Sequence, residues 1–403
     1  MRIVVMKFGG TSVASPESRR QIVEKVRESR RRGNSPVVVV SAMGRAPSPY
    51  ATDSLIGLVE SFQGFGCPAE MDQLMATGET LSAIVMAHTF RSADIPSRSF
   101  DGRQAGIETS DEYGNGKVVY IDPEPLTVYL HTGGVPVVTG FQGVNSTGRV
   151  TTLGRGGSDT SAVALGAALK AHFVEIYTDV DGVMTADPRV YSESEILSQI
   201  NFEEMGELAS EGAKVIHPRA VEMADLHGVP VWIKNTLNSR PGTFMARAVP
   251  RQAYERDRVI SGIAHMFGMT GLIMEIPDRA MQVDTLEKLA ECGVNLDLIN
   301  VTPRRLYAIL PTRAYESSGR ELLDTLGLKF QATHGCAKIS IVGAGMRGTP
   351  GVMAQVLSCL HQAGVTVIHS TDSNITISIL VKEEDVPKAV AALHDQFLSE
   401  PVG

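Results

Sequence analysis

The chain has 403 residues, enough for two or three domains, and 43% of them are hydrophobic, enough for well-filled cores. Its formal net charge of −8 argues against nucleic acid as a partner, so any anion must be held by a local site. The four cysteines are far apart and form no Cys-x-x-Cys pair, which excludes a cysteine-based zinc site and a disulfide framework. No signal peptide or long apolar run is recognisable, so we expect a cytoplasmic protein that does not associate with membranes.

Short apolar segments alternate with amphipathic ones over roughly the first 245 residues, which indicates an open, mainly parallel α/β sheet covered by helices. Ser15, Pro16 and Glu17 are typical of a helix start, and Gly33 is typical of the end of the same helix. We predict strands at residues 3–6, 37–41, 135–139, 173–178 and 229–233.

Lys7 lies at the end of the first predicted strand and is followed by two glycines and two hydroxyl residues, at positions 9–12. This order places a positive charge beside exposed backbone N–H groups, which suits a phosphate group. It is not the usual phosphate loop, in which the lysine follows the glycines. A lysine that merely closes a strand before a tight turn is the alternative interpretation.

Two further segments place polar groups at the ends of predicted elements, where α/β proteins build their sites. Ser41 follows a buried strand, and Thr77–Gly78–Glu79 is expected to open another helix. Together they predict a site at this edge of the sheet.

Glycines and hydroxyl residues at positions 154–161 precede a strongly helical run at residues 162–169. Free N–H groups at the start of a helix form an anion site, and Arg155 can bind a carboxylate or phosphate through two parallel hydrogen bonds. Asp159 needs a neighbouring cation in such a site. A role as a simple helix cap is the alternative for Asp159.

Residues 177–189 run from a strand end into a long polar loop. The carboxylates of this loop could hold ribose hydroxyls or water around a metal, and Arg189 could contact phosphate. The loop lacks the spacing and the closing glutamate of a calcium loop, which argues against calcium. Lys214, after another predicted helix, is a candidate for a second phosphate contact.

A turn at residues 238–242 and a charged stretch at 250–258 predict a domain boundary near residue 255. Beyond it a pattern recurs at an offset of 71 positions, and each copy predicts a strand, a helix that ends at glycine, and another strand. Modules of about 70 residues are too small for a rich core, so they should pack together or with a second chain. The recurring residues are Leu286, Leu289, Gly293 and Val294, then Leu357, Leu360, Gly364 and Val365.

Residues 343–348 match the Gly-x-Gly-x-x-Gly dinucleotide fingerprint, and Asp372 lies at a plausible distance for a ribose contact. Too few residues follow for a dinucleotide-binding domain, and Pro350 interrupts the turn. A small repeat module is the favoured interpretation, and an NAD-dependent dehydrogenase is the alternative.

Four stretches, at residues 7–12, 154–159, 178–189 and 212–218, together resemble aspartokinases, in the right order and nearly end to end. The resemblance implies an amino-acid-kinase fold, a three-layer αβα sandwich with a mainly parallel open sheet, followed by two ferredoxin-like ACT modules. The implied domains are a catalytic domain at 1–250, ACT module 1 at 260–335, whose completion by the C-terminal segment stays open, and ACT module 2 at 336–403.

The implied reaction transfers the γ-phosphoryl group of ATP to the side-chain carboxylate of L-aspartate. This is the first step towards lysine and diaminopimelate, threonine and methionine. ATP would bring Mg²⁺ with it, and we expect no dedicated metal site in the protein. Because a carboxylate is already deprotonated at pH 7, no general base is needed, and the obstacle is to align two anions.

The resemblance also implies roles for individual residues. Lys7 would neutralise charge on the moving phosphoryl group, Asp159 would orient Lys7, and Glu79 would bind the ammonium of aspartate. Many relatives carry tyrosine where Met184 stands. The aspartate-binding residues would be Thr52, Glu79, Arg155, Gly156, Gly157 and Ser158. The ATP-binding residues would be Lys7, Phe8, Gly9, Gly10, Ser41, Ser158, Thr178, Asp179, Met184, Thr185, Ala186, Asp187, Pro188, Arg189 and Lys214.

ACT modules usually bind amino acids at their mutual interface. Here residues 278–281 replace the Pro-Gly turn of many relatives, and residues 371–375 replace the Ser-Thr-Ser-Glu-Ile of lysine- and threonine-sensitive members. The pattern, with residues 50–54, is closer to the diaminopimelate-sensitive form of spore-forming bacteria. We therefore expect feedback inhibition by meso-diaminopimelate in a homodimer or higher homo-oligomer formed through the ACT modules; modules that serve only dimerisation are the alternative. The candidate effector contacts are Asp278, Asn295, Asp297, Asp372 and Asn374.

Other acceptors are compatible with the same fold, namely glutamate, a carbamate or a nucleotide monophosphate, although such relatives seldom carry tandem ACT modules. A non-catalytic amino-acid sensor would also keep the fold. The intact Lys7 and Asp159 argue against that interpretation.

Overall fold

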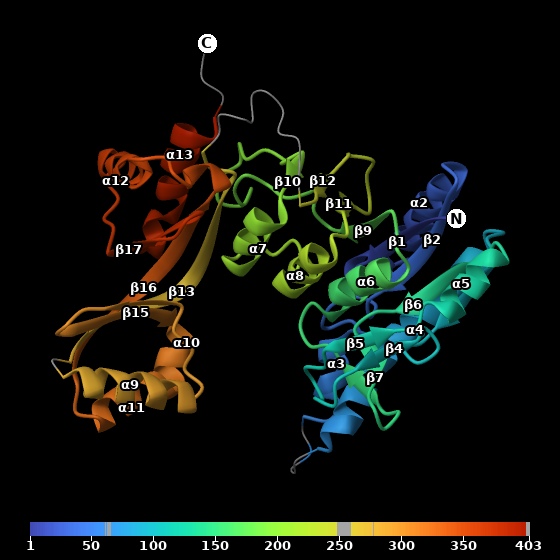
Figure 1. The fold of residues 1–403 in the computed structure, drawn as a ribbon, viewed down its shortest axis with the longest axis horizontal. Coiled ribbons are helices and arrows are strands. Elements are labelled where there is room, and N and C mark those ends of the chain that lie inside the picture. The colour runs from blue at the N-terminus through green and yellow to red at the C-terminus, as the bar shows by residue number, and fades with distance from the viewer. Residues whose placement is uncertain (61, 63–65, 248–258, 277, 400–403) are drawn as a thin grey trace. The chain divides into compact units, whose positions relative to one another are not determined.

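The computed structural model describes residues 1–60, 62, 66–247, 259–276 and 278–399 (Figure 1). The described residues form two compact units. The predicted domain boundary near residue 255 lies outside the described residues. The first unit comprises Met1–Val183, Ile196–Ser210 and Lys214–Pro250, and the second comprises Met184–Glu195, Glu211–Ala213 and Arg251–Gly403.

An eight-stranded sheet forms the centre of the first unit, in the order β10-β12-β11-β9-β1-β2-β6-β3. Neighbouring strands are parallel except β11 and β12. The apolar run 37–40 is fully buried, as expected for a parallel strand covered on both faces. The strands are β1 (Arg2–Phe8), β2 (Asn34–Val40), β3 (Ser97–Phe100), β6 (Val135–Thr139), β9 (Phe173–Thr178), β10 (Gln199–Ile200), β11 (Val231–Asn235) and β12 (Thr243–Met245).

Helices cover both faces of this sheet and make the predicted three layers. Met6 and Phe8 of β1 share a core with helices α2 and α4, whereas the intervening Lys7 points to Asp159 of helix α6 on the opposite face. Ser15 caps α2 by accepting a hydrogen bond from the N–H of Ser18, as the sequence predicted. The helices are α1 (Gly10–Val13), α2 (Pro16–Arg31), α3 (Thr52–Gly57), α4 (Pro68–Arg91), α5 (Glu124–His131), α6 (Gly157–Ala168), α7 (Phe202–Ser210) and α8 (Pro218–His227).

The expected helix start at Thr77–Gly78–Glu79 is wrong, because these residues lie inside α4, which begins at Pro68. A proline fits the first turn of a helix and sets the start there. Gly78 is needed mid-helix for a different reason. A Cβ at Gly78 would lie 2.8 Å from the Cβ of Ala42, so the glycine lets α4 approach the segment after β2.

A smaller sheet of four strands, in the order β5-β4-β7-β8, also belongs to the first unit and was not predicted. Its strands have only three or four residues each, too few to show a clear two-residue alternation in the sequence. They are β4 (Ile107–Thr109), β5 (Val118–Ile121), β7 (Gln142–Val144) and β8 (Val150–Thr152).

The second unit contains a six-stranded antiparallel sheet in the order β14-β15-β13-β16-β18-β17. The two long strands β13 and β16 each serve two hydrophobic cores: Leu272 and Met274 lie in one, and Ile263 and Ile341 lie in the other. The two modules therefore share their central strands. The strands are β13 (Gly262–Glu275), β14 (Leu298–Val301), β15 (Arg305–Pro311), β16 (Lys329–Val342), β17 (His369–Asp372) and β18 (Thr376–Lys382).

The repeat seen in the sequence recurs in the helix ends of the second unit. Gly293 and Gly364 both adopt a left-handed φ, of +71° and +65°. The N–H groups of the following residues, Val294 and Val365, donate 2.9 Å hydrogen bonds to the carbonyls of Leu289 and Leu360 respectively. The helices are α9 (Arg279–Glu291), α10 (Thr312–Ala314), α11 (Arg320–Thr325), α12 (Val352–Gln362) and α13 (Val386–Phe397).

The glycine fingerprint at residues 343–348 connects β16 to α12, and β16 is paired antiparallel with both of its neighbours, β13 and β18. A dinucleotide site needs a parallel βαβ unit at this position. The fold therefore favours the small repeat module. In addition, no helix within the described part of the chain is long and apolar enough to cross a bilayer.

Candidate active site

Lys7 and Asp159 form an ion pair at the carboxyl end of β1, an interior strand of the central sheet. The Lys7 Nζ lies 2.6 Å from Asp159 Oδ1, and the two side chains are only 11% and 13% exposed. β1 supplies the lysine and the first turn of α6 supplies the aspartate, so the fold brings together two residues 152 positions apart. The cation that an aspartate in an anion site requires is thus Lys7.

The glycine turn after β1 is packed tightly against the end of β2. A Cβ at Gly10 would lie 2.7 Å from the carbonyl oxygens of Ala42 and Gly44, so only glycine fits there. The N–H of Gly9 donates to the carbonyl of Tyr177 over 3.2 Å. The expected donation from Gly9 to a phosphate would therefore require this bond to break.

Two cavities meet at Lys7. The larger, of about 560 Å³, is lined by Arg155 and the start of α6, and the smaller, of about 230 Å³, by the glycine turn and Thr178. All six residues expected to bind aspartate line the larger cavity. The residues that line both cavities are Lys7, Ser41, Thr52 and Glu79.

Glu79 presents a buried carboxylate to both cavities. Its side chain lies in α4, the residue is 3% exposed, and Oε1 accepts a 2.9 Å hydrogen bond from the N–H of Ala42. Oε2 is buried and has no hydrogen-bond partner among the described residues. Burial raises the pKa of Glu79 to about 7, because the charged form is poorly solvated. An ammonium group that entered the cavity would satisfy this oxygen.

The other residues expected to bind ATP are divided between the units. In the first, Thr178 lines the smaller cavity, the exposed Asp179 pairs with Arg45 at 3.3 Å, and Lys214 is exposed. The ring of Phe8 is fully buried and stacks on Tyr177, with centroids 4.7 Å apart. Phe8 can therefore reach a nucleotide only through its backbone.

Residues 184–189 belong to the second unit and are partly used in its packing. The Thr185 hydroxyl lies 2.8 Å from Nε2 of His394, and Ala186 is part of a hydrophobic core. These two side chains already have structural partners, so Thr185 and Ala186 would contact ATP through their backbone groups. The exposed guanidinium of Arg189 pairs with Asp187 at 2.7 Å and lowers the pKa of that carboxyl group.

Two of the five expected effector contacts also have partners within the chain. Asp278 caps α9 through the N–H of Ala280, and Asp297 accepts hydrogen bonds of 2.6 and 2.7 Å from the fully buried Lys338. The signal for Lys338 in the sequence is a lone lysine at the start of the mainly apolar run 338–342. The exposed effector candidates are Asp278, Asn295, Asp372 and Asn374.

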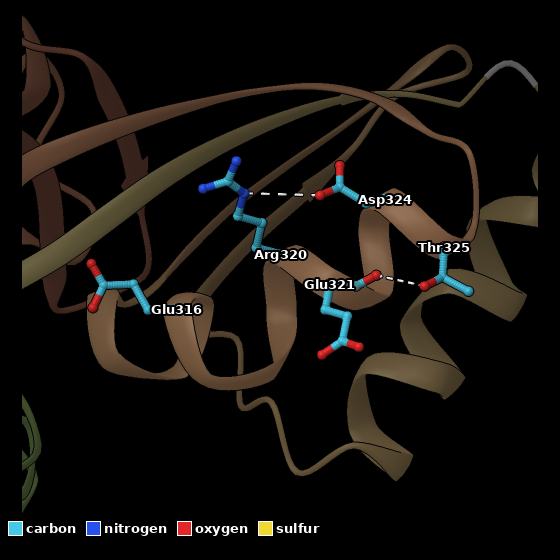
Figure 2. Close-up of a pocket in the computed structure, with 5 residues that line it drawn as sticks. All are labelled: Glu316, Arg320, Glu321, Asp324 and Thr325. Carbon is cyan, nitrogen blue, oxygen red and sulfur yellow. Dashed lines mark hydrogen bonds and ion pairs between the residues drawn. The ribbon is translucent and has the colours of Figure 1, made fainter.

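Another pocket of the second unit contains none of these candidates (Figure 2). Two interactions join polar groups of this pocket: Arg320 pairs with Asp324 at 3.8 Å, and the hydroxyl of Thr325 donates to the carbonyl of Glu321 over 2.7 Å. The pocket does not add to the candidate active site.

Comparison with known proteins agrees with this geometry. The profile of the amino acid kinase family matches residues 2–235, and that of the ACT domain matches residues 331–395. The chain is 40% identical to aspartokinase 1 of Bacillus subtilis (strain 168) over 403 residues, which cover 98% of this chain and 99% of the relative. The chain belongs to the aspartokinase family. It is therefore an enzyme, a kinase, and the predicted amino-acid-kinase fold with an ACT domain is confirmed.

Solved structures of Escherichia coli aspartokinase III are similar over the whole chain. The complex with aspartate and ADP, in the R-state, is 26% identical with a TM-score of 0.76 and covers 98% of this chain and 100% of that chain. The complex with lysine and aspartate, in the T-state, is 26% identical with a TM-score of 0.80 and covers 99% and 100%.

The buried Glu79 should make stability depend on pH. Because its pKa is raised from 4.5 to about 7 in the folded protein, its contribution to the free energy of unfolding decreases as pH rises through this range. Glu79→Gln removes a penalty of up to about 3 kcal/mol at pH 8, and little of it at pH 5.

The measurement is the thermal unfolding midpoint at both pH values. The exposed Glu70 on the same helix gives the matched control, Glu70→Gln, which should show no such trend. A gain for Glu79→Gln that is equal at pH 5 and pH 8 would contradict the assignment.

Proposed function

We propose that this enzyme transfers the γ-phosphoryl group of ATP to the side-chain carboxylate of L-aspartate. One observation carries the proposal: Lys7 lies where two cavities meet, and each cavity suits one anionic substrate. The product would be 4-phospho-L-aspartate, the first intermediate towards lysine and diaminopimelate, threonine and methionine, and the cytoplasm would be the compartment.

The larger cavity would hold aspartate. Glu79 would bind the ammonium group, and Arg155 with the N–H groups at the start of α6 would bind a carboxylate. The start of α6 requires glycine at position 156, because its φ is +71° and a Cβ there would clash with the side chain of His217. The complex of the E. coli relative with aspartate and ADP supports the choice of ligands.

The smaller cavity would hold the phosphates of ATP, with Gly10, Ser41 and Thr178 around them. A carboxylate oxygen of aspartate would attack the γ-phosphorus, and the bond to the bridging oxygen would break so that ADP leaves. No proton has to be removed from the acceptor at pH 7. The work of the protein is therefore alignment and neutralisation of charge.

Lys7 would neutralise the charge that develops on the moving group, and Asp159 would fix the direction of Lys7. Mg²⁺ would come with ATP. The described residues contain no group of three or more His, Cys, Asp or Glu side chains that could hold a metal ion. We therefore assign no step to an ion held by the protein.

The acceptor is tested by a coupled ADP-release assay with aspartate, glutamate, carbamate and nucleoside monophosphates. We expect turnover with aspartate and at most a small fraction of it with the others. Preference for another acceptor would replace the proposed reaction, and no ATP turnover with any acceptor would favour a non-catalytic sensor.

Replacement of Lys7 tests its role. Lys7→Ala should lower kcat by roughly 10²–10³, the range for the loss of one preorganised donor. A Lys7→Ala, Asp159→Asn double variant should lose little more, because Asp159 acts through Lys7.

The control for Lys7 is Lys117→Ala, which removes an exposed lysine of the same unit. Normal turnover in the Lys7 variant would remove this residue from the mechanism. If the kcat losses of Lys7→Ala and Asp159→Asn multiply in the double variant, the two residues act independently.

We further propose that meso-diaminopimelate inhibits a homodimer or higher homo-oligomer through the second unit. The effector has two amino-acid ends, which suit an exposed polar set such as Asn295, Asp372 and Asn374. The complex of the E. coli relative with lysine supports an amino-acid effector in the family.

Steady-state assays with diaminopimelate, lysine, threonine and methionine test the effector. We expect inhibition by diaminopimelate, weakened in Asn374→Ala. Inhibition by micromolar lysine with no response to diaminopimelate would contradict the proposal. If none of the four compounds inhibits the enzyme, dimerisation remains as the role of the ACT modules.

A further inference from the structure

Asp72 is a buried carboxylate of α4 that does not line either cavity. It is 1% exposed and accepts three hydrogen bonds. Its Oδ2 accepts from the N–H of Gly114 over 2.9 Å and from the N–H of Thr152 over 2.7 Å. Its Oδ1 accepts from the hydroxyl of Thr152 over 3.0 Å. None of the ion pairs among the described residues includes Asp72, so uncharged donors alone compensate for its burial.

Both partners of Asp72 belong to the wall of the larger cavity. They come from segments 42 and 80 residues further along the chain, before β5 and at the end of β8. The N–H of Gly116 also donates to the carbonyl of Thr152 over 2.8 Å, which ties the two segments to each other. The carboxylate therefore fastens one wall of the cavity, which contains Gly114 and Thr152, to α4.

The same helix carries residues of the cavity itself. Asp72, Met75 and Glu79 follow one another at spacings of three and four and so lie on one face of α4. Met75 and Glu79 line the cavity in which aspartate would bind. Because Asp72 and Glu79 belong to the same helix, α4 fixes the position of the wall relative to Glu79.

Gly114, in this wall, packs closely against Gly154, another residue that lines the cavity. Gly114 and Gly154 both adopt a left-handed φ, of +76° and +71°, and a Cβ at Gly154 would lie 3.1 Å from the carbonyl oxygen of Gly114. Gly154 leads directly into Arg155 and the start of α6. A shift of the wall would change the cavity where the carboxylate group of an amino acid would lie.

We propose that Asp72 is a positioning residue that holds this wall against α4 and thereby sets the affinity for the acceptor amino acid. The identity of the ligand, aspartate, rests on the proposed function. The role of Asp72 in holding the wall rests on its hydrogen bonds alone. Asp72 does not reach the cavity that would hold ATP, so the nucleotide should bind as before.

Steady-state kinetics of three variants test the proposal. Asp72→Ala should raise KM for aspartate about tenfold or more and leave KM for ATP within about twofold, since three hydrogen bonds are lost. Asp72→Asn should restore much of the affinity, because its oxygen can accept both N–H groups and its amide can donate to the Thr152 hydroxyl. Thr152→Val removes only the hydroxyl and should give an intermediate increase.

The matched control is again Glu70→Gln, an exposed carboxylate two residues before Asp72. It should change neither KM. Hydrogen exchange gives a readout that does not depend on the substrate: residues 110–116 and 150–154 should exchange faster in Asp72→Ala than in the control.

The outcomes separate the two proposals. Faster exchange with an unchanged KM for aspartate would reduce Asp72 to a purely structural role, and so would a lower kcat with both KM values unchanged. Unchanged exchange would show that Asp72 does not hold the wall. If the unmodified enzyme does not phosphorylate aspartate, the proposed function fails, while the exchange data still decide the role of Asp72.

Discussion

The ion pair between Lys7 and Asp159 is the interaction on which the site depends. It joins the central strand of the sheet to the start of the helix on one face, where the helix dipole favours a carboxylate. A largely buried lysine is costly unless it has a partner, and Asp159 supplies one without filling either cavity. The lysine is thereby fixed at the junction of two spaces that would otherwise have no cation between them.

The helix α4 organises the acceptor side of this junction. It carries two buried carboxylates in different environments: Asp72 has three donors, whereas Glu79 has one. The carboxylate of Asp72 has its hydrogen bonds satisfied and stabilises the wall, whereas Oε2 of Glu79 is free to accept a hydrogen bond from a ligand. Gly78, between them, allows the helix to approach the segment after β2 closely enough for Ala42 to donate to Glu79.

The sequence was sufficient where the signal is local or repeated. Apolar runs predicted the central strands, β6 and β9 with their observed bounds, and the offset of 71 positions predicted two helices with the same glycine ending. The order of lysine, glycines and hydroxyls predicted an anion site at Lys7, and the aspartate at the start of α6 predicted a need for a cation.

Partners that meet only in three dimensions could not be predicted in this way. Nothing next to Thr185 in the sequence indicates His394, and nothing next to Asp297 indicates Lys338. For this reason Thr185 and Asp297, which were expected to bind ligands, instead contact side chains of the second unit. The wall held by Asp72 was missed because its strands are short and its donors are backbone groups, which carry no residue signature.

The central claim is that phosphoryl transfer takes place at Lys7, where the two cavities meet. The most direct test is a crystal structure with ADP, aspartate and aluminium fluoride as the analogue of the moving phosphoryl group. We expect the analogue at this junction, within about 3 Å of the Lys7 Nζ, with the aspartate carboxylate on one side and ADP on the other. An analogue bound out of reach of Lys7, with Lys7 paired to Asp159 alone, would contradict it.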